Sequence, residues 1–250
     1  MSAAPRGQWF DLAYSLVSDD TGRKGGKLSH QVSLAHEHDF GPLGTLGASV
    51  WLDFFRNPLS DRNTRAIQDL NEVDYSAYWS HQIDPLATTV TVGWTAQTFP
   101  QFTGDKAWTQ EVFVTLAVDD RRIFGTKEGL LNPYLGYFQD LDDFPGGWIE
   151  MGVSHCFRLA DLAGDQAPVL KHLTVSPAVL AAIDHRQLAK VTQLAMLRYG
   201  VEIGYDLSSA WKIPANCGVF TVSGFVYYTQ AFEDELRPVL FGGLSLRYSL

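Results

Sequence analysis

Apolar and polar side chains alternate one by one along twelve segments of this chain, and this alternation restricts the fold more than any other feature. Successive side chains of a strand point to opposite faces of the sheet, so a period of two predicts strands with one apolar and one polar face. The segments occupy residues 11–16, 31–35, 46–54, 73–79, 90–96, 112–118, 131–139, 148–157, 169–180, 197–207, 218–228 and 239–248. The chain is therefore predicted to be all-β.

The length of the segments favours a membrane protein. Seven of them span 9 to 12 residues. Strands of soluble sheets cluster near 5 or 6 residues, whereas strands of about 9 to 11 residues cross a bilayer at a tilt. The longest mainly apolar stretches, 112–118 and 175–183, fall short of the roughly 18 residues of a membrane-spanning helix. We therefore expect one domain over residues 1–250, a transmembrane antiparallel up-and-down β-barrel of about twelve strands.

Short and long connections alternate between the predicted strands. Outer-membrane barrels have short periplasmic turns and longer outside loops. The predicted periplasmic turns occupy residues 39–44, 83–85 and 208–211, and the more polar outside loops occupy 19–27, 57–69, 99–106, 140–147, 184–192 and 229–237. The connections at 119–130 and 159–167 are longer than this scheme prefers. The alternation places both chain ends on the periplasmic side.

The two faces of the predicted strands differ in chemistry. The apolar face, which we expect to contact lipid, comprises Tyr14, Leu16, Val32, Leu34, Val50, Leu52, Tyr75, Ala77, Val90, Val92, Val114, Leu116, Ile149, Met151, Val201, Ile203, Leu244 and Leu246. The opposite face, expected to line a polar interior, carries Asp11, Glu37, Asp53, Glu72, Asp74, Glu111, Asp119, Glu150, Glu202 and Asp206 with Arg158, Arg198 and Arg247. A soluble barrel would reverse the two faces, and periodicity alone does not separate these cases.

Aromatic residues support the membrane interpretation. Trp9, Phe54, Trp79, Trp108 and Trp211 are among those near strand ends, where interfacial girdles lie in membrane barrels. Six others have inward parity and would narrow the lumen: Trp51, Tyr78, Phe113, Tyr134, Phe138 and Trp148.

Net charge and cysteine spacing exclude several functions. A net charge of -9 with scattered basic residues argues against nucleic acid, which needs a concentrated Lys/Arg face. Cys156 and Cys217 lie in no Cys-x-x-Cys or Cys/His pattern. We expect no metal, cofactor or disulfide framework.

A few residues could carry other chemistry. His36 and His38 share a strand face and could bind zinc, but no third ligand is evident, and their parity places them at the lipid–water boundary. Glu72/Asp74, or Asp53, Glu111 and Glu150, could supply the acid/base pair of a glycosidase. The acidic runs 140–143 and 233–235 lack the spacing of a Ca²⁺ loop.

The last strand and three internal stretches carry a family resemblance. Residues 241–250 alternate to the end of the chain and resemble the C-terminal assembly signal of bacterial outer-membrane barrels, although they close in Leu250 and not in an aromatic residue. Residues 71–75, 132–140 and 147–155 resemble small single-chain outer-membrane barrels of the TorF type. The resemblance implies a bacterial outer-membrane location for a mature chain without its signal peptide, recognition by the outer-membrane assembly machinery, and a pore function without catalytic residues.

The sequence therefore predicts a porin-like channel for passive diffusion of ions or small solutes, with a narrow lumen and a preference for cations. Its predicted pore-lining residues are Asp53, Glu72, Asp74, Glu111, Glu150, Arg198, Glu202 and Arg247. The expected partners are a lipid bilayer or detergent and small ions or solutes. Two alternatives remain open at this stage: a soluble ligand-binding β-barrel, and an outer-membrane hydrolase on the same barrel.

Overall fold

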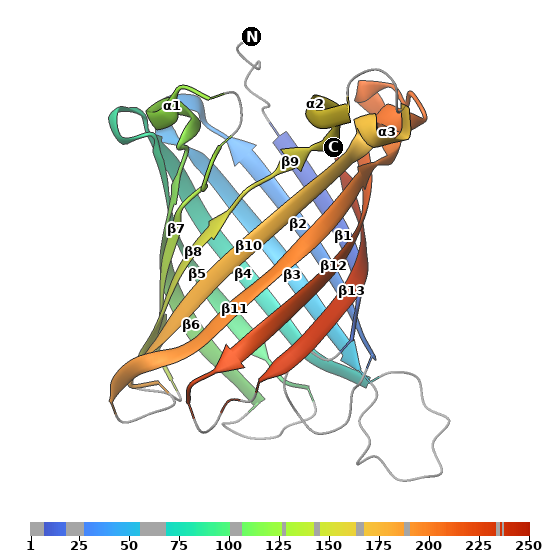
Figure 1. Cartoon of the computed structure of the whole chain (residues 1–250). Coiled ribbons are helices and arrows are strands. Elements are labelled where there is room, and N and C mark those ends of the chain that lie inside the picture. Colours follow the sequence, from blue (N-terminus) through green and yellow to red (C-terminus); the bar gives the residue numbers. More distant parts are fainter. Residues whose placement is uncertain are drawn as a thin grey trace, which may run out of the picture.

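A computed structural model describes residues 8–18, 28–55, 69–100, 107–126, 129–142, 146–163, 168–187, 191–233, 236 and 238–250. Within these residues, twelve long strands form a single antiparallel sheet that closes on itself (Figure 1). None of the described helices is long and apolar enough to cross a membrane. The predicted fold class, an antiparallel barrel of about twelve strands, is confirmed.

The strands follow one another around the barrel in chain order, each paired with its sequence neighbours. They are β1 (Gln8–Ser18), β2 (Leu28–Asp39), β3 (Thr45–Phe55), β4 (Asp69–Ile83), β5 (Thr88–Thr98), β6 (Trp108–Val118), β7 (Tyr134–Asp140), β8 (Gly147–Ser154), β10 (Leu173–His185), β11 (Thr192–Asp206), β12 (Val219–Ala231) and β13 (Val239–Ser249). A two-residue strand, β9 (Phe157–Arg158), pairs with the start of β10. Pairing of β1 with β13 closes the barrel.

The two ends of the barrel differ, as the alternation of connections predicts. The start of β1, the C-terminal Leu250 and the short helical turns lie at one end, which we call the turn end (Figure 1). Its turns contain η1 (Gly41–Leu43), η2 (Asp84–Leu86), α1 (Arg121–Phe124), α2 (Leu159–Ala163), η5 (Pro168–His172), α3 (Leu207–Ala210) and η6 (Ala215–Cys217). The other end, the loop end, carries the predicted outside loops. Most of their residues, including 19–27 and 101–106, lie outside the described parts of the chain.

The outer surface carries a continuous apolar belt. Cross-strand registers align Val50 with Tyr75, Val92 with Val114, and Leu246 with Tyr14 across the closing pair. Large apolar side chains on this face are exposed, among them Ile203 at 50% and Leu244 at 60%. Because such a surface is stable in lipid and not in water, the faces are arranged as in a membrane barrel.

Several local predictions differ from the structure. The predicted strand 148–157 ends at Ser154, and the predicted strand 169–180 begins with the short helix η5 before β10. Asp119 lies beyond the end of β6 and not on the wall. There it accepts two hydrogen bonds from Arg121, at 2.7 and 2.8 Å, and this contact lowers the pKa of the Asp119 carboxyl.

The long turn between β6 and β7 is organised around a buried carboxylate. Asp120 is 1% exposed and accepts backbone hydrogen bonds from Leu130, Leu131 and Asn132, at 3.1, 2.6 and 3.2 Å. Three donors around one carboxylate satisfy backbone groups that a turn would otherwise leave unpaired. This is how a connection longer than the predicted scheme keeps a defined shape.

Candidate functional site: the lumen

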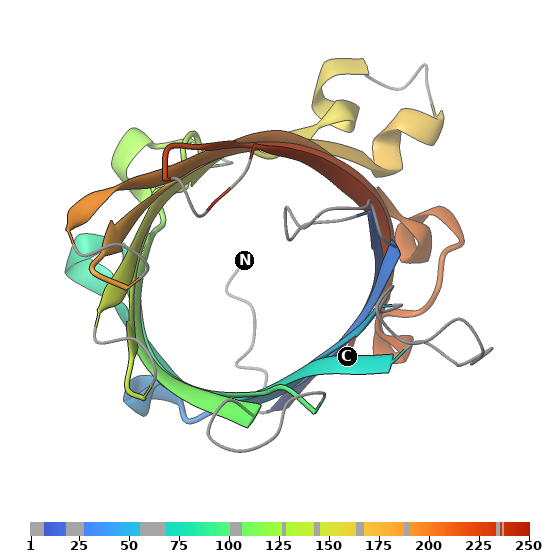
Figure 2. The same ribbon diagram turned by 90° about the horizontal axis from the view of Figure 1, so that it is seen from below.

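The interior of the barrel is lined by the polar parity of every long strand. One row across the wall joins Ser49, Ser76, Thr95 and Glu111 in register. Viewed along the barrel axis, the described helical turns lie outside the ring of strands (Figure 2). The lumen is therefore the concave, polar part of the molecule in which a solute could be held.

Acidic side chains gather on the wall formed by β3 to β8, in the half nearer the loop end. Asp53 and Glu72 are direct cross-strand partners, and Asp74 pairs in the same way with Trp51. Ser29 on β2 donates a hydrogen bond to Asp53, which is buried. The first three predicted pore-lining residues thus lie together on neighbouring strands.

The same wall continues through β6, β7 and β8. Glu111 lies directly opposite Asp140, which accepts a 2.9 Å hydrogen bond from the hydroxyl of Thr109. Glu150 accepts a 3.2 Å hydrogen bond from the indole N–H of Trp148. Sequence analysis missed Asp140 because it assigned this residue to a loop, although extending the alternation of residues 131–139 by one position gives it inward parity. We call Asp53, Glu72, Asp74, Glu111, Asp140 and Glu150 the acidic wall.

The basic residues predicted to line the pore lie on β11 and β13, outside the strands of the acidic wall. Arg247 on β13 is ion-paired with Asp11 on β1, at 2.7 Å. Arg198 on β11 donates to the hydroxyl of Thr229 at 3.2 Å, and its guanidinium lies 5.2 Å from the ring centroid of Phe241. Both arginines therefore have partners within the protein.

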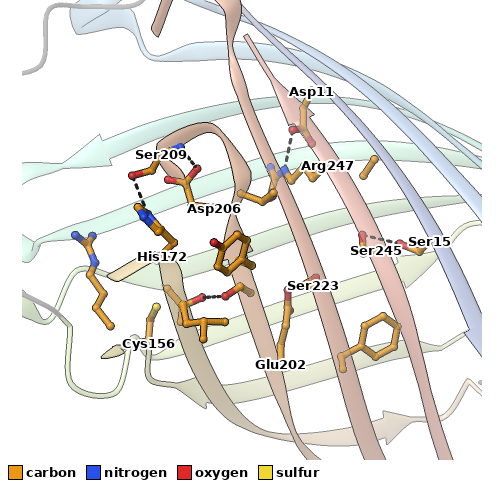
Figure 3. Close-up of a pocket in the computed structure, with 18 of the residues that line it drawn as sticks. Asp11, Ser15, Cys156, His172, Glu202, Asp206, Ser209, Ser223, Ser245 and Arg247 are labelled. Carbon is orange, nitrogen blue, oxygen red and sulfur yellow. Dashed lines mark hydrogen bonds and ion pairs between the residues drawn. The ribbon is translucent and has the colours of Figure 1, made fainter. Parts of the chain in front are cut away.

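A cavity of about 970 Å³ opens into the lumen at the turn end, between β10 and β2 (Figure 3). Glu202, the remaining predicted residue, lines it together with Asp11, Arg247 and a series of serine and threonine hydroxyls. Lys171 and His172 also line this cavity and were not singled out from the sequence. Both come from η5, which replaces the start of a predicted strand.

Two of the six inward aromatic residues, Tyr78 and Phe113, lie along the wall. The ring of Tyr78 covers Gly47 on the adjacent strand, and the ring of Phe113 covers Gly93, so a side chain at either glycine would collide with the ring. Tyr78 also donates a 2.6 Å hydrogen bond to Glu37. Because glycine leaves space for a ring on the neighbouring strand, these two rings lie against the wall.

The geometry gives little support to the metal sites considered from the sequence. His36 and His38 lie on the outer face near the turn end, where the His38 ring packs against Phe40 with centroids 4.4 Å apart. In the described parts of the chain, no group of three or more His, Cys, Asp or Glu side chains could hold a metal ion. Residues 143, 234 and 235 of the two acidic runs lie outside those parts.

No protein-family model matches the chain, and no curated protein does. Solved structures match nearly its whole length. The COG4313 outer membrane channel from Pseudomonas putida F1 is similar with a TM-score of 0.56 and 12% identity, over 99% of this chain and 96% of that one. The KdgM porin gives a TM-score of 0.51 and 12% identity, over 96% and 99% of the two chains. The NanC porin gives 0.51 and 12%, over 96% and 98%.

These similarities establish the fold. At 12% identity they do not establish the function. The chain has the closed antiparallel barrel of small outer-membrane porins and channels. The three neighbours are named as porins or channels and not as enzymes. None is named as the TorF type, so that part of the resemblance stays a prediction.

Proposed function

We propose that this protein is a narrow channel for passive diffusion in a bacterial outer membrane, with a preference for cations. Three features support the proposal: the apolar outer belt, the polar lumen, and a fold similar to that of porins and channels. The expected environment is then the lipid bilayer, and the expected solutes are small ions. The expected partner during insertion is the outer-membrane assembly machinery. Membership of the TorF type belongs to this proposal as well.

The observation that carries cation preference is the acidic wall. Six carboxyl groups lie on strands between β3 and β8. Arg247 is instead ion-paired with Asp11 on the closing strands, and Arg198, two strands from β8 and within electrostatic reach of Glu150, donates to Thr229. Carboxylates along a low-dielectric wall raise the local concentration of cations, and rings of Asp and Glu select cations in other channels. Salt screens this attraction over about 10 Å at 0.1 M, so selectivity is greatest at low ionic strength.

Reversal potentials in a planar bilayer under a KCl gradient test the proposal. The wild-type protein should prefer K⁺ to Cl⁻, and the preference should grow as salt is lowered. Neutralising the wall with Glu111→Gln and Glu150→Gln should reduce it, whereas Arg198→Gln should increase it or leave it unchanged. The arginine variant is the matched control, because it also replaces one inward charge by an amide.

Two results would reject the channel as proposed. Anion selectivity, or none, at low salt would mean that the acidic wall does not face the permeation route. Absence of conductance from protein that has folded and inserted into lipid would reject diffusion through the lumen.

A further inference from the structure

The turn-end cavity contains a carboxylate that lies outside the acidic wall and next to two aromatic rings. Glu202 on β11 lies directly opposite Phe225 on β12, and both line the cavity together with Tyr227. The three side chains therefore form one continuous patch of the cavity wall. Figure 3 shows Glu202 among the side chains that line this cavity.

Within the described parts of the chain, the charge of Glu202 acts on the neighbouring Tyr227 but is not neutralised by a basic partner. No hydrogen bond or ion pair formed by those residues involves Glu202. The other carboxylates of the cavity are engaged: Asp11 pairs with Arg247, and Asp206 accepts a 2.8 Å hydrogen bond from the backbone N–H of Ser209. A carboxylate left without a partner inside a cavity is available to a cationic solute.

The aromatic rings continue as a row along the wall. The rings of Phe225 and Tyr227 have centroids 6.0 Å apart, and Tyr227 stacks on Phe241 at 5.7 Å. At the far end of this row the guanidinium of Arg198 lies over Phe241. The row therefore already binds one organic cation, which belongs to the protein itself. At the other end of the row, Phe225 lies beside Glu202 and lines the cavity, where a second cation could bind.

Carboxylate and ring faces together favour a particular kind of cation. A ring face attracts a cation within about 6 Å of its centroid, most effectively when the cation has lost its water, and quaternary ammonium groups are recognised in this way. Small metal cations hold their hydration shells more tightly. A methylated ammonium group can contact the rings while its charge lies near the carboxylate.

We propose that Glu202, Phe225 and Tyr227 form a binding site for small organic ammonium ions. This site would add a solute class to the proposed channel, and its role in transport rests on that proposed function. Binding itself does not require conductance. Lys171 and Arg158 line the same cavity and have other interactions. Glu202 and the two rings can recognise only the ammonium group of a ligand. The prediction therefore specifies that group and leaves the rest of the ligand undefined.

Binding of choline to the full chain folded in detergent tests the site, with titration calorimetry or saturation-transfer NMR as the measurement. Choline should bind to the wild type, and its neutral carbon analogue 3,3-dimethylbutan-1-ol should not. Glu202→Gln and Phe225→Leu should each weaken binding by about tenfold. Asp84→Asn is the matched control, because it removes one carboxylate from an exposed turn outside the cavity. Resistance to SDS before boiling verifies that each variant has folded.

The outcomes separate the site from the channel. Equal choline affinity in the wild type and both cavity variants, or equal binding of the neutral analogue, would overturn the site whatever the conductance. Choline binding that depends on Glu202, in a protein that conducts no K⁺, would support the site and reject the channel.

Discussion

Arg247 on the last strand donates a hydrogen bond of 2.7 Å from Nε to Oδ1 of Asp11 on the first strand. Ser249 donates to the same oxygen at 2.6 Å. The side chain of Asp11 is 10% exposed and that of Arg247 is 52% exposed, so the carboxylate is the buried partner. This contact stands on the inner face of the pair β1–β13, and it adds a charged side-chain link to the backbone ladder that closes the barrel.

A double-mutant cycle should measure this link. We expect Asp11→Asn and Arg247→Gln to show a coupling of about 0.5–3 kcal/mol, the range found for residues in one hydrogen-bonded network. Urea titrations of folding into lipid vesicles provide the free energies. The exposed pair Asp84–Arg122, at 3.0 Å, is the control and should couple by less than about 1 kcal/mol. A larger coupling at the exposed pair would contradict a special contribution from the closing strands.

Deletion of residues 244–250 should prevent formation of a compact barrel. The deletion removes most of the ladder between β13 and its two neighbours, and each unpaired backbone group in hydrocarbon costs several kcal/mol. The measurement is migration in SDS gels with and without boiling. A shortened chain that still migrates as a compact, heat-sensitive form would show that this strand is not needed for closure.

A lysine should be tolerated differently at two adjacent positions of β6. Val114 is 37% exposed and aligns with Val92 on the apolar belt, whereas Thr115 aligns with Thr91 and Gly136 on the inner face. Val114→Lys should cost about 2–4 kcal/mol near the bilayer midplane, and Thr115→Lys should cost less. Folding titrations into lipid compare the two. Equal losses would refute the assignment of the two faces.

The turn between β6 and β7 should depend on Asp120 and not on Asp119. Asp120→Ala leaves three backbone N–H groups without their acceptor, so a loss of about 3 kcal/mol is expected. Asp119→Ala removes an exposed ion pair with Arg121 and should cost less than about 1 kcal/mol. The same lipid titration measures both, and a larger loss at Asp119 would be inconsistent with the buried carboxylate organising the turn.

Sequence alternation was sufficient for the strands and their faces because lipid and lumen impose opposite chemistry on adjacent residues. Val114 and Thr115 could be assigned to opposite sides without knowing any neighbouring strand. Strand ends were less predictable: Asp140 is the last residue of β7, and only pairing with Glu111 shows that it belongs to the wall.

Contacts across strands could not be predicted in the same way. The link between Asp11 and Arg247 depends on which strands meet and in which register, and alternation carries no information about either. Whether Glu202 has a partner depends on the side chains that several other strands place around it, and these are known only from the structure. Helical turns such as α1 are too short to show a helical period, so the role of Asp120 in its turn and the place of His172 in the cavity wall followed only from the structure.

Closure by the first and last strands also bears on how the barrel assembles. Each of the other strand pairs joins segments that follow one another in the sequence, whereas Asp11 and Arg247 are 236 positions apart. Contacts between distant positions require the entropy cost of loop closure to be met first, and they slow folding. Assembly should therefore extend a sheet hairpin by hairpin, with the joining of β1 to β13 as its last and slowest step. Until that step, the backbone N–H and C=O groups at the edges of β1 and β13 remain unpaired, and exposing such groups to hydrocarbon is energetically costly.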